Sequence, residues 1–166
     1  RWQTAPAPTG FYHGRSMIAV RILDSDPDRP LDADFFRRRI FRAIALRREV
    51  LALERQTDSF RVIHAEGDGL SGLIVDRFDD SLVIEYFSQA MHRRHGLLRD
   101  ILLEGFPGAR VIWRVDADLA AREGIPAAPP PPEGEVEIRE NKMRFLVRPG
   151  GGHKTGFFLD QRENRE

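Results

Sequence analysis

The sequence predicts an α+β fold with a mixed or antiparallel sheet, two main helices and several hairpins. An alternation of apolar and polar side chains predicts a strand at 59–65, and short apolar runs predict strands at 73–78 and 82–87. Apolar residues at helical spacing predict long helices at 33–55 and 90–104. These strands and helices do not alternate as regular βαβ units, which favours α+β over a parallel α/β arrangement.

The first thirty residues predict the end of a preceding unit. Residues 1–10 carry two prolines and no periodicity, so we interpret them as a tail or connector. The pattern at 17–23, MIAVRIL, predicts a strand, and an Asp- and Pro-rich turn follows it. Such punctuation after a strand is typical of the end of a small domain.

The first long helix has a favourable start and a clear apolar face. Asp32 or Asp34 can cap its N-terminus, where a negative charge also suits the helix macrodipole. Arg47 falls on the apolar side and is expected near the rim of the packed surface. The apolar face is expected to comprise Phe36, Ile40, Ala43, Ile44 and Leu51.

Arg38 and Arg42 point away from that apolar face. One interpretation is an ordinary solvated helix face. The other is a ridge that contacts phosphates, because a local excess of arginine is the electrostatic footprint of nucleic-acid binding. The residues of the helix leave both interpretations open.

The central region contains motifs that resemble ligand-binding sites but lack the structural context or spacing that such sites require. GDGLSG at 67–72 matches the glycine spacing of a dinucleotide fingerprint, but a strand follows it where that fingerprint requires a helix. We interpret it as a tight connection between strands, with the next two strands forming a hairpin. Neither the aspartates at 76–80 nor the histidines have the spacing of metal ligands, and His92 and His95 are expected on a solvent-facing side of their helix.

The second half of the chain continues with short elements. We expect a strand at 110–115, a helical turn at 116–123 and a hairpin formed by 135–139 and 143–147. Between them, 124–134 contains five prolines and cannot form regular structure. This segment is either a semi-rigid connector or a polyproline ligand for a partner.

The richest stretch for chemistry closes the sequence: GGGHKTGFFLDQREN at 150–164, where 158–165 predicts a helix start. Its glycines let backbone amides approach a ligand closely. Lys154 and Arg162 can neutralise an anion, and Phe157 and Phe158 can stack on a base or fill a core. The alternative is structural: a glycine-rich turn before an apolar helix start.

Composition excludes several classes of site. With no cysteine, the chain has no disulfide, zinc-thiolate site or thiol nucleophile, and the expected localisation is cytoplasmic. No apolar run approaches the ~20 residues of a membrane span, and no signal segment opens the sequence. The formal net charge is zero, so global charge predicts no partner.

Several motifs, taken in order, resemble one family. They are FFRRRI at 35–40, DGLSGLIVDRF at 68–78, Arg122-Glu123-Gly124, Arg139-Glu140-Asn141 and GHKTGFFLDQREN at 152–164. This set resembles the S-adenosylmethionine-dependent ribosomal RNA large-subunit methyltransferases of the cytosine-C5 type. A guanine-N7 relative shares a similar closing motif, so the resemblance favours cytosine C5 without excluding that branch.

The resemblance implies three parts. Residues 1–30 would be a connector and the last strand of a PUA-like RNA-binding domain, 31–148 a central α+β domain, and 149–166 the entry to a Rossmann-like methyltransferase domain. The family's cofactor loop and catalytic cysteine follow the point where this sequence ends. The chain is therefore expected to be a fragment, inactive alone, of a parent enzyme that uses S-adenosylmethionine and binds ribosomal RNA.

The resemblance also assigns residues. The cofactor pocket or its lid would include Lys154, Thr155, Gly156, Phe158, Asp160 and Gln161. RNA contacts would come from Arg38, Arg39 and Arg42. Two other functions stay open, a non-catalytic nucleic-acid-binding module and an interaction scaffold that uses the proline segment. Apolar surface at a domain boundary would favour association, so a homodimer is a further expectation.

Overall fold

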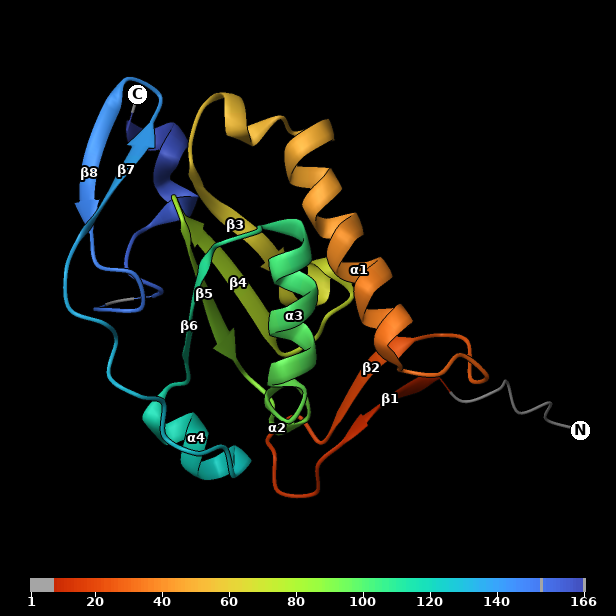
Figure 1. Ribbon diagram of the computed structural model, residues 1–166. Helices are drawn as coiled ribbons and strands as arrows, with labels where there is room; N and C mark the ends of the chain where they lie inside the picture. Colours follow the sequence, from red (N-terminus) through yellow and green to blue (C-terminus); the bar gives the residue numbers. More distant parts are fainter. Residues whose placement is uncertain (1–7, 153, 166) are drawn as a thin grey trace, which may run out of the picture.

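The computed structural model describes residues 8–152 and 154–165 (Figure 1). His153, part of the closing motif, lies outside the described residues. The strands are β1 (Thr9–Tyr12), β2 (Val20–Asp24), β3 (Ser59–His64), β4 (Leu73–Phe78), β5 (Ser81–Tyr86), β6 (Arg110–Arg114), β7 (Val136–Glu140) and β8 (Met143–Val147). The α-helices are α1 (Ala33–Ala45), α2 (Gln89–His92), α3 (His95–Gly105) and α4 (Ala117–Glu123). Shorter helical segments are a π-helix at Leu46–Val50 and 3-10 helices at Leu53–Arg55, Ala65–Asp68 and Leu159–Arg165.

The central sheet has the strand order β3-β4-β5-β6. The first three strands are antiparallel neighbours, and β6 pairs with β5 in parallel. The parallel pair requires a crossover, which α2 and α3 provide, because strands running in the same direction cannot be joined by a tight turn. The predicted mixed α+β fold is therefore confirmed, as are both predicted hairpins.

One face of this sheet packs against α1 and α3 (Figure 1). Asp32 caps α1 by accepting a hydrogen bond from the backbone N–H of Phe35. Four of the five residues predicted for the apolar face of this helix are buried in the main core, against strand residues such as Val75 and Ile84. The prediction that Leu51 also belongs to this face is wrong, because this residue is 51% exposed.

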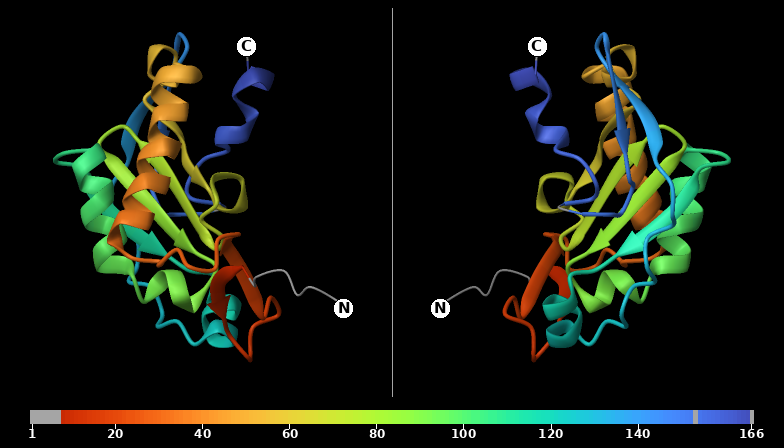
Figure 2. Two further views of the ribbon diagram at one scale, coloured as in Figure 1. Left: turned by 90° about the vertical axis from the view of Figure 1, so that its right-hand side faces the viewer. Right: turned by 90° about the vertical axis from the view of Figure 1, so that its left-hand side faces the viewer.

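The opposite face of the sheet carries the end of the chain. The β7–β8 hairpin and the 3-10 helix Leu159–Arg165 lie on this side, away from α1 (Figure 2). A second, smaller core joins them to the sheet. Phe78, Val83 and Ile112 of the sheet contribute to it, together with Phe157 and Leu159. The sheet therefore separates α1, on one face, from the closing segment, on the other.

The N-terminal region departs from the prediction. Part of the expected connector is strand β1, which pairs antiparallel with β2 in a separate two-stranded sheet. Pairing is tight enough at Gly10 that a Cβ there would overlap the carbonyl oxygen of Arg21. Strand β1 was not predicted because Gly10 lies outside any apolar pattern and glycine has a low β-propensity.

Three helices also differ from expectation. The helix predicted at 33–55 is α-helical only to Ala45, then widens into a π-helix and ends where Ala52 takes a left-handed conformation (φ 49°). The helix predicted at 90–104 is divided between α2 and α3. The helix start predicted at 158–165 is a 3-10 helix. None of the helices among the described residues is long and apolar enough to cross a membrane.

Candidate functional site

The glycine-rich loop 148–156 closes on itself. The N–H of Gly150 donates to the carbonyl oxygen of Thr155 at 2.7 Å, and the N–H of Gly151 donates to that of Arg148 at 3.0 Å. Gly156 (φ 127°) lies so near Arg148 that a Cβ would overlap its carbonyl oxygen. Glycine is required here both for the backbone angle and for the close approach.

Thr155 fixes this loop to the central sheet. Its hydroxyl donates to Oδ2 of Asp76 on β4 at 2.5 Å, and both residues are fully buried. Arg61 on β3 donates to the same carboxylate from Nε at 2.8 Å and from Nη2 at 3.1 Å. The hydrogen bond with Asp76 raises the pKa of the Arg61 guanidinium. The hydroxyl of Thr155 therefore points toward the sheet, and is not available to a ligand on the outer side.

Lys154, Phe158 and Asp160 lie on the outer side of the loop. The Lys154 ammonium donates to both carboxylate oxygens of Asp160 at 2.7 Å and sits 4.6 Å from the centre of the Phe158 ring. This hydrogen bond lowers the pKa of Asp160. All three side chains are exposed, so a cation, an anion and an aromatic ring are presented together.

Gln161 extends this outer surface, and Arg165 holds it in place. Gln161 is exposed and accepts a hydrogen bond from Asn164 at 2.6 Å. Arg165 forms two hydrogen bonds of 2.8 Å with Glu140, a fully buried carboxylate at the end of β7. Its guanidinium also lies 4.4 Å from the Phe157 ring centre. The outer surface formed by Lys154, Gly156, Phe158, Asp160 and Gln161 is called the outer wall below.

A second ion pair lies on the same face of the sheet as Asp76. Glu85 on β5 and Arg114 on β6 are opposite one another in the register, with 3.2 Å between Oε1 and Nε. Burial raises the pKa of Glu85, while Arg114 opposes that shift. Nη1 of Arg114 is buried and has no hydrogen-bond partner within the described structure. Charged side chains from all four strands thus lie on one face of the sheet.

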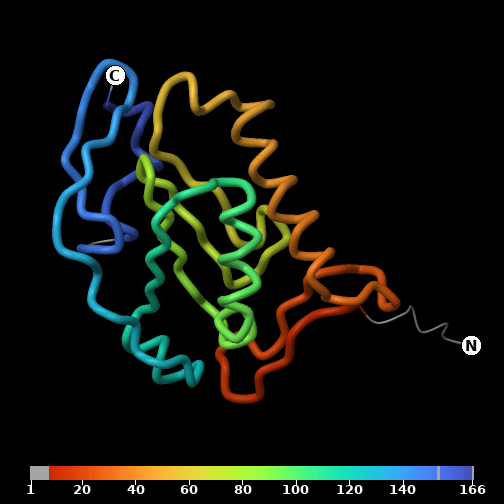
Figure 3. Tube along the Cα trace, in the orientation of Figure 1, coloured from red at the N-terminus to blue at the C-terminus, as the bar shows by residue number. Residues whose placement is uncertain are grey.

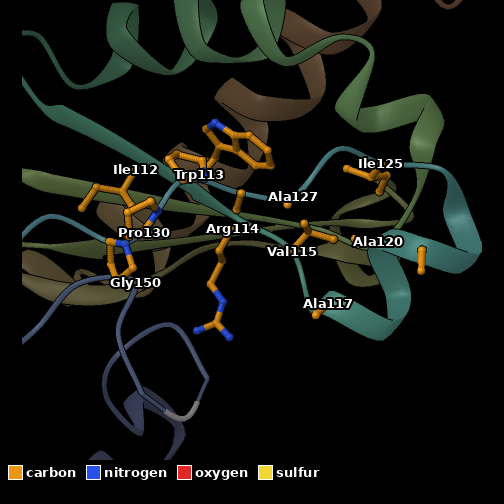
Figure 4. Close-up of a pocket in the computed structure, with 14 residues that line it drawn as sticks. Ile112, Trp113, Arg114, Val115, Ala117, Ala120, Ile125, Ala127, Pro130 and Gly150 are labelled. Carbon is orange, nitrogen blue, oxygen red and sulfur yellow. The ribbon is translucent and has the colours of Figure 1, made fainter.

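The pocket beside Arg114 has a volume of about 530 Å³ and runs between β6, α4 and the proline segment (Figure 4). Figure 4 shows Arg114 pointing to one side of β6 and Trp113 to the other. Apart from Arg114, the walls of the pocket are mainly apolar and include Ile112, Ile125 and Pro131. Gly150 also lines it, so this pocket adjoins the glycine-rich loop.

The predicted RNA-contacting arginines do not form one set. Arg38 and Arg42 are exposed on α1, and their side chains have no polar partner among the described residues. Arg39 instead donates to Asp24 at 3.1 Å and to the carbonyl oxygen of Leu23 at 3.2 Å, which joins α1 to β2. None of the three lies near the outer wall, since α1 is on the opposite face of the sheet (Figure 2).

The expectation that His92 and His95 face solvent is wrong. Both are half-buried against Tyr86 and Trp113, and the Tyr86 hydroxyl is 2.8 Å from Nδ1 of His95. Burial lowers the pKa of each imidazole, and for His95 the neighbouring His92 adds to the effect. Within the described residues, no group of three or more His, Cys, Asp or Glu could hold a metal ion.

Three residues of the site have no role predicted from the sequence. Asp76 and Glu140 lie within two of the motifs that resemble the family, but those motifs do not indicate which residues they contact. Glu140 and Arg165 lie 25 positions apart, and no local pattern links them. Only the tertiary fold brings the hairpin turn and the closing helix together.

Comparison with curated proteins finds close similarity to one group. The chain is 38% identical over 161 residues to ribosomal RNA large subunit methyltransferase I of Shewanella amazonensis, 39% to that of Shewanella denitrificans and 35% to that of Escherichia coli. In each case the match covers 94% of this chain and 40% of the relative. This chain therefore spans about 40% of the length of these relatives. No family model matches it.

Solved structures share the fold at lower identity. A candidate SAM-dependent methyltransferase from Streptococcus mutans has a TM-score of 0.75 and 18% identity, over 96% of this chain and 41% of that one. The crystal structure of a candidate methyltransferase complexed with SAH has a TM-score of 0.70 and 19% identity, over 89% of this chain and 37% of the other. At these identities, the similarity establishes a common fold.

Proposed function

We propose that this chain is part of an S-adenosylmethionine-dependent methyltransferase that modifies cytosine C5 in large-subunit ribosomal RNA. The observation that carries the proposal is the 35–39% identity, over 94% of the chain, to relatives named as ribosomal RNA large subunit methyltransferases. The outer wall also supports the proposal, because the residues of the wall can recognise groups that S-adenosylmethionine carries.

Within this proposal, residues 1–30 belong to the end of a PUA-like domain, 31–148 form the central domain and 149–166 enter the methyltransferase domain. The pairing of β1 with β2 gives the N-terminal segment a sheet of its own, and Leu23 of β2 packs in the main core. The closing segment packs on the hairpin through Phe157 and Leu159, so the third part begins from a fixed support. Catalytic groups lie elsewhere in the parent protein, and the chain alone transfers no methyl group.

The outer wall fits one side of S-adenosylmethionine by the chemistry of its side chains. Lys154 can neutralise the carboxylate of the cofactor, and Asp160 can accept hydrogen bonds from its hydroxyl or amino groups. The exposed ring of Phe158 can stack on the adenine or lie beside the sulfonium charge. When bound, the cofactor supplies an electrophilic methyl group.

Cofactor binding by the full-length protein tests this wall. Asp160→Ala and Gln161→Ala are each expected to weaken S-adenosylmethionine binding about ten-fold in calorimetry, because each removes a polar partner. Glu163→Ala is a matched control, since Glu163 is exposed on the same 3-10 helix and makes no polar side-chain contact within the described structure. Unchanged affinity in both wall variants would remove these residues from the cofactor site.

We also propose that Arg38 and Arg42 contact RNA phosphates. Their guanidinium groups have no polar partner among the described residues, so they can neutralise phosphates without breaking an existing ion pair. Changing both to Gln should reduce the slope of log K against log salt by about 1.4 to 1.8 for two lost phosphate contacts. Arg144→Gln, an exposed arginine of β8, is the control. An unchanged slope would refute the assignment.

A non-catalytic nucleic-acid-binding module is the second candidate, favoured by the separation of α1 from the outer wall (Figure 2). Incubation of the full-length protein with labelled S-adenosylmethionine and unmodified large-subunit RNA distinguishes the two functions. Methyltransfer, with 5-methylcytidine identified by mass spectrometry, supports the enzyme. RNA binding without transfer supports the module, and a different methylated nucleoside corrects the target atom.

A further inference from the structure

We infer that Asp76, through Thr155, is a positioning residue for the outer wall. The inference deepens the proposed cofactor function and rests on it. Asp76 is on β4, in the middle of the sheet, whereas the wall is on a loop more than seventy residues later in the sequence. A buried hydroxyl–carboxylate hydrogen bond between Thr155 and Asp76 joins the two.

The conformation of the loop shows why an anchor is needed at this point. Lys154 has a left-handed backbone (φ 54°), and Gly156 has φ 127°, so unusual conformations flank Thr155 on both sides. A residue other than glycine in the left-handed region is disfavoured, and persists where surrounding contacts hold it. The contacts that hold it are the side chain of Thr155 on Asp76 and the carbonyl of Thr155 on Gly150.

This arrangement also determines the direction of Lys154. Since Thr155 points into the sheet and is fully buried, the residue before it is directed to the outer side, where Lys154 meets Asp160. Arg61 connects Asp76 with the outer wall. Its guanidinium neutralises the buried Asp76 carboxylate, and it is also close enough to Asp160 for the charge of that carboxylate to raise the pKa of Arg61. The strand pair β3–β4 thus sets the geometry of the wall.

The carboxylate of Asp76 is suited to this role because it is otherwise inaccessible. With 0% exposure, it can neither bind a ligand directly nor replace a lost donor with bulk water. Loss of the Thr155 hydroxyl would leave Oδ2 of Asp76 with Arg61 as its one remaining hydrogen-bond donor among the described residues. The loop would lose its fixed position, and a cofactor would then have to order it on binding.

The experiment compares Thr155→Val, which removes the hydroxyl at nearly constant shape, with Thr155→Ser, which keeps it. Both are made in the full-length protein. Hydrogen exchange of amides 150–156 is measured without cofactor, and S-adenosylmethionine affinity by calorimetry. We expect Thr155→Val to increase loop exchange and weaken affinity, each about ten-fold, which corresponds to one lost buried hydrogen bond. Thr155→Ser should restore both to within about two-fold.

Asp76→Asn separates charge from shape. Its amide oxygen can still accept from Thr155, but the ion pair with Arg61 is lost, so loop exchange should increase less than in Thr155→Val. Unchanged loop exchange in Thr155→Val overturns the inference. So does faster exchange with unchanged cofactor affinity, or a failure of Thr155→Ser to rescue. A wild-type protein that binds no S-adenosylmethionine refutes the proposed function instead, and the positioning role falls with it even if the exchange data show the anchor.

Discussion

Arg47 and Arg42 are five residues apart on one continuous helical segment but occupy opposite environments, which makes them a sharp test of what each arginine does. Arg47 is buried, and its guanidinium donates to both oxygens of Asp68 at 2.6 and 2.9 Å. It also donates to the backbone carbonyls of Arg61 and Ala43 at 3.1 and 3.3 Å. Arg42 is exposed, without a polar partner in the described part of the chain.

We predict that Arg47→Met lowers the free energy of unfolding by about 3 kcal/mol, the low end of the cost of breaking a buried ion pair. Met keeps the apolar stem, so the loss is mainly that of the four polar contacts. The side chains of Arg47 and Asp68 are only 10% and 7% exposed, so water compensates little. Arg42→Met should change the same quantity by less than about 0.5 kcal/mol.

Urea denaturation, followed by far-ultraviolet circular dichroism, measures both variants by linear extrapolation. The double variant Arg47→Met with Asp68→Asn should recover part of the loss, because the uncompensated carboxylate is removed. A coupling energy of at least about 1 kcal/mol is expected between the two positions. A loss below about 1 kcal/mol for Arg47→Met, or additivity in the double variant, would refute the reasoning.

Three further predictions follow from the same geometry. Gly156→Ala should cost more unfolding free energy than Gly152→Ala, by about 1 to 3 kcal/mol, because both need positive φ but only Gly156 lacks room for a Cβ; equal costs would contradict the crowding. Arg165→Met should leave Glu140 buried without its partner and increase hydrogen exchange across 159–165 at least about ten-fold, whereas unchanged protection would show that the ion pair is not the anchor. His95→Gln should flatten the fall in melting temperature between about pH 7 and pH 5. The folded-state pKa of His95 lies below its ordinary value of 6.5, so the unfolded chain binds the proton more tightly and stability decreases as pH falls below that value; an equally steep profile in the variant would contradict this sign.

The sheet and its hairpins were predictable because their signals are local. β3 alternates apolar and polar residues, β4 and β5 each contain a run of three apolar residues, and the turn at Asp79 lies between those two strands. The N-cap of α1 and the glycine that ends α4 also act within a few residues, and the structure has both as expected. Local periodicity therefore carries the order and type of most elements.

The contacts that build the site were not predictable in this way. Thr155 and Asp76 are 79 positions apart, and Arg165 and Glu140 are 25 apart, so neither pair has a sequence spacing to detect. In the divided helix at 89–105, His92 and His95 both pack against Tyr86, a contact that periodicity does not encode. The polar groups of the outer wall lie within 150–164, the segment in which the residues predict a site, and its binding of a cofactor stays a prediction.

The proline segment has a consequence for the behaviour of the protein in solution. β6 is an outer strand of the central sheet, and open strand edges invite pairing with another chain. The connection from α4 to β7 passes this strand (Figure 3), with Pro129, Pro130 and Pro131 facing it across the pocket. Prolines have no N–H to donate to the carbonyls of the edge, so this cover shields β6 without becoming a strand itself. The segment predicted as a connector or a polyproline ligand therefore also lies over the edge of the sheet at which another chain could pair.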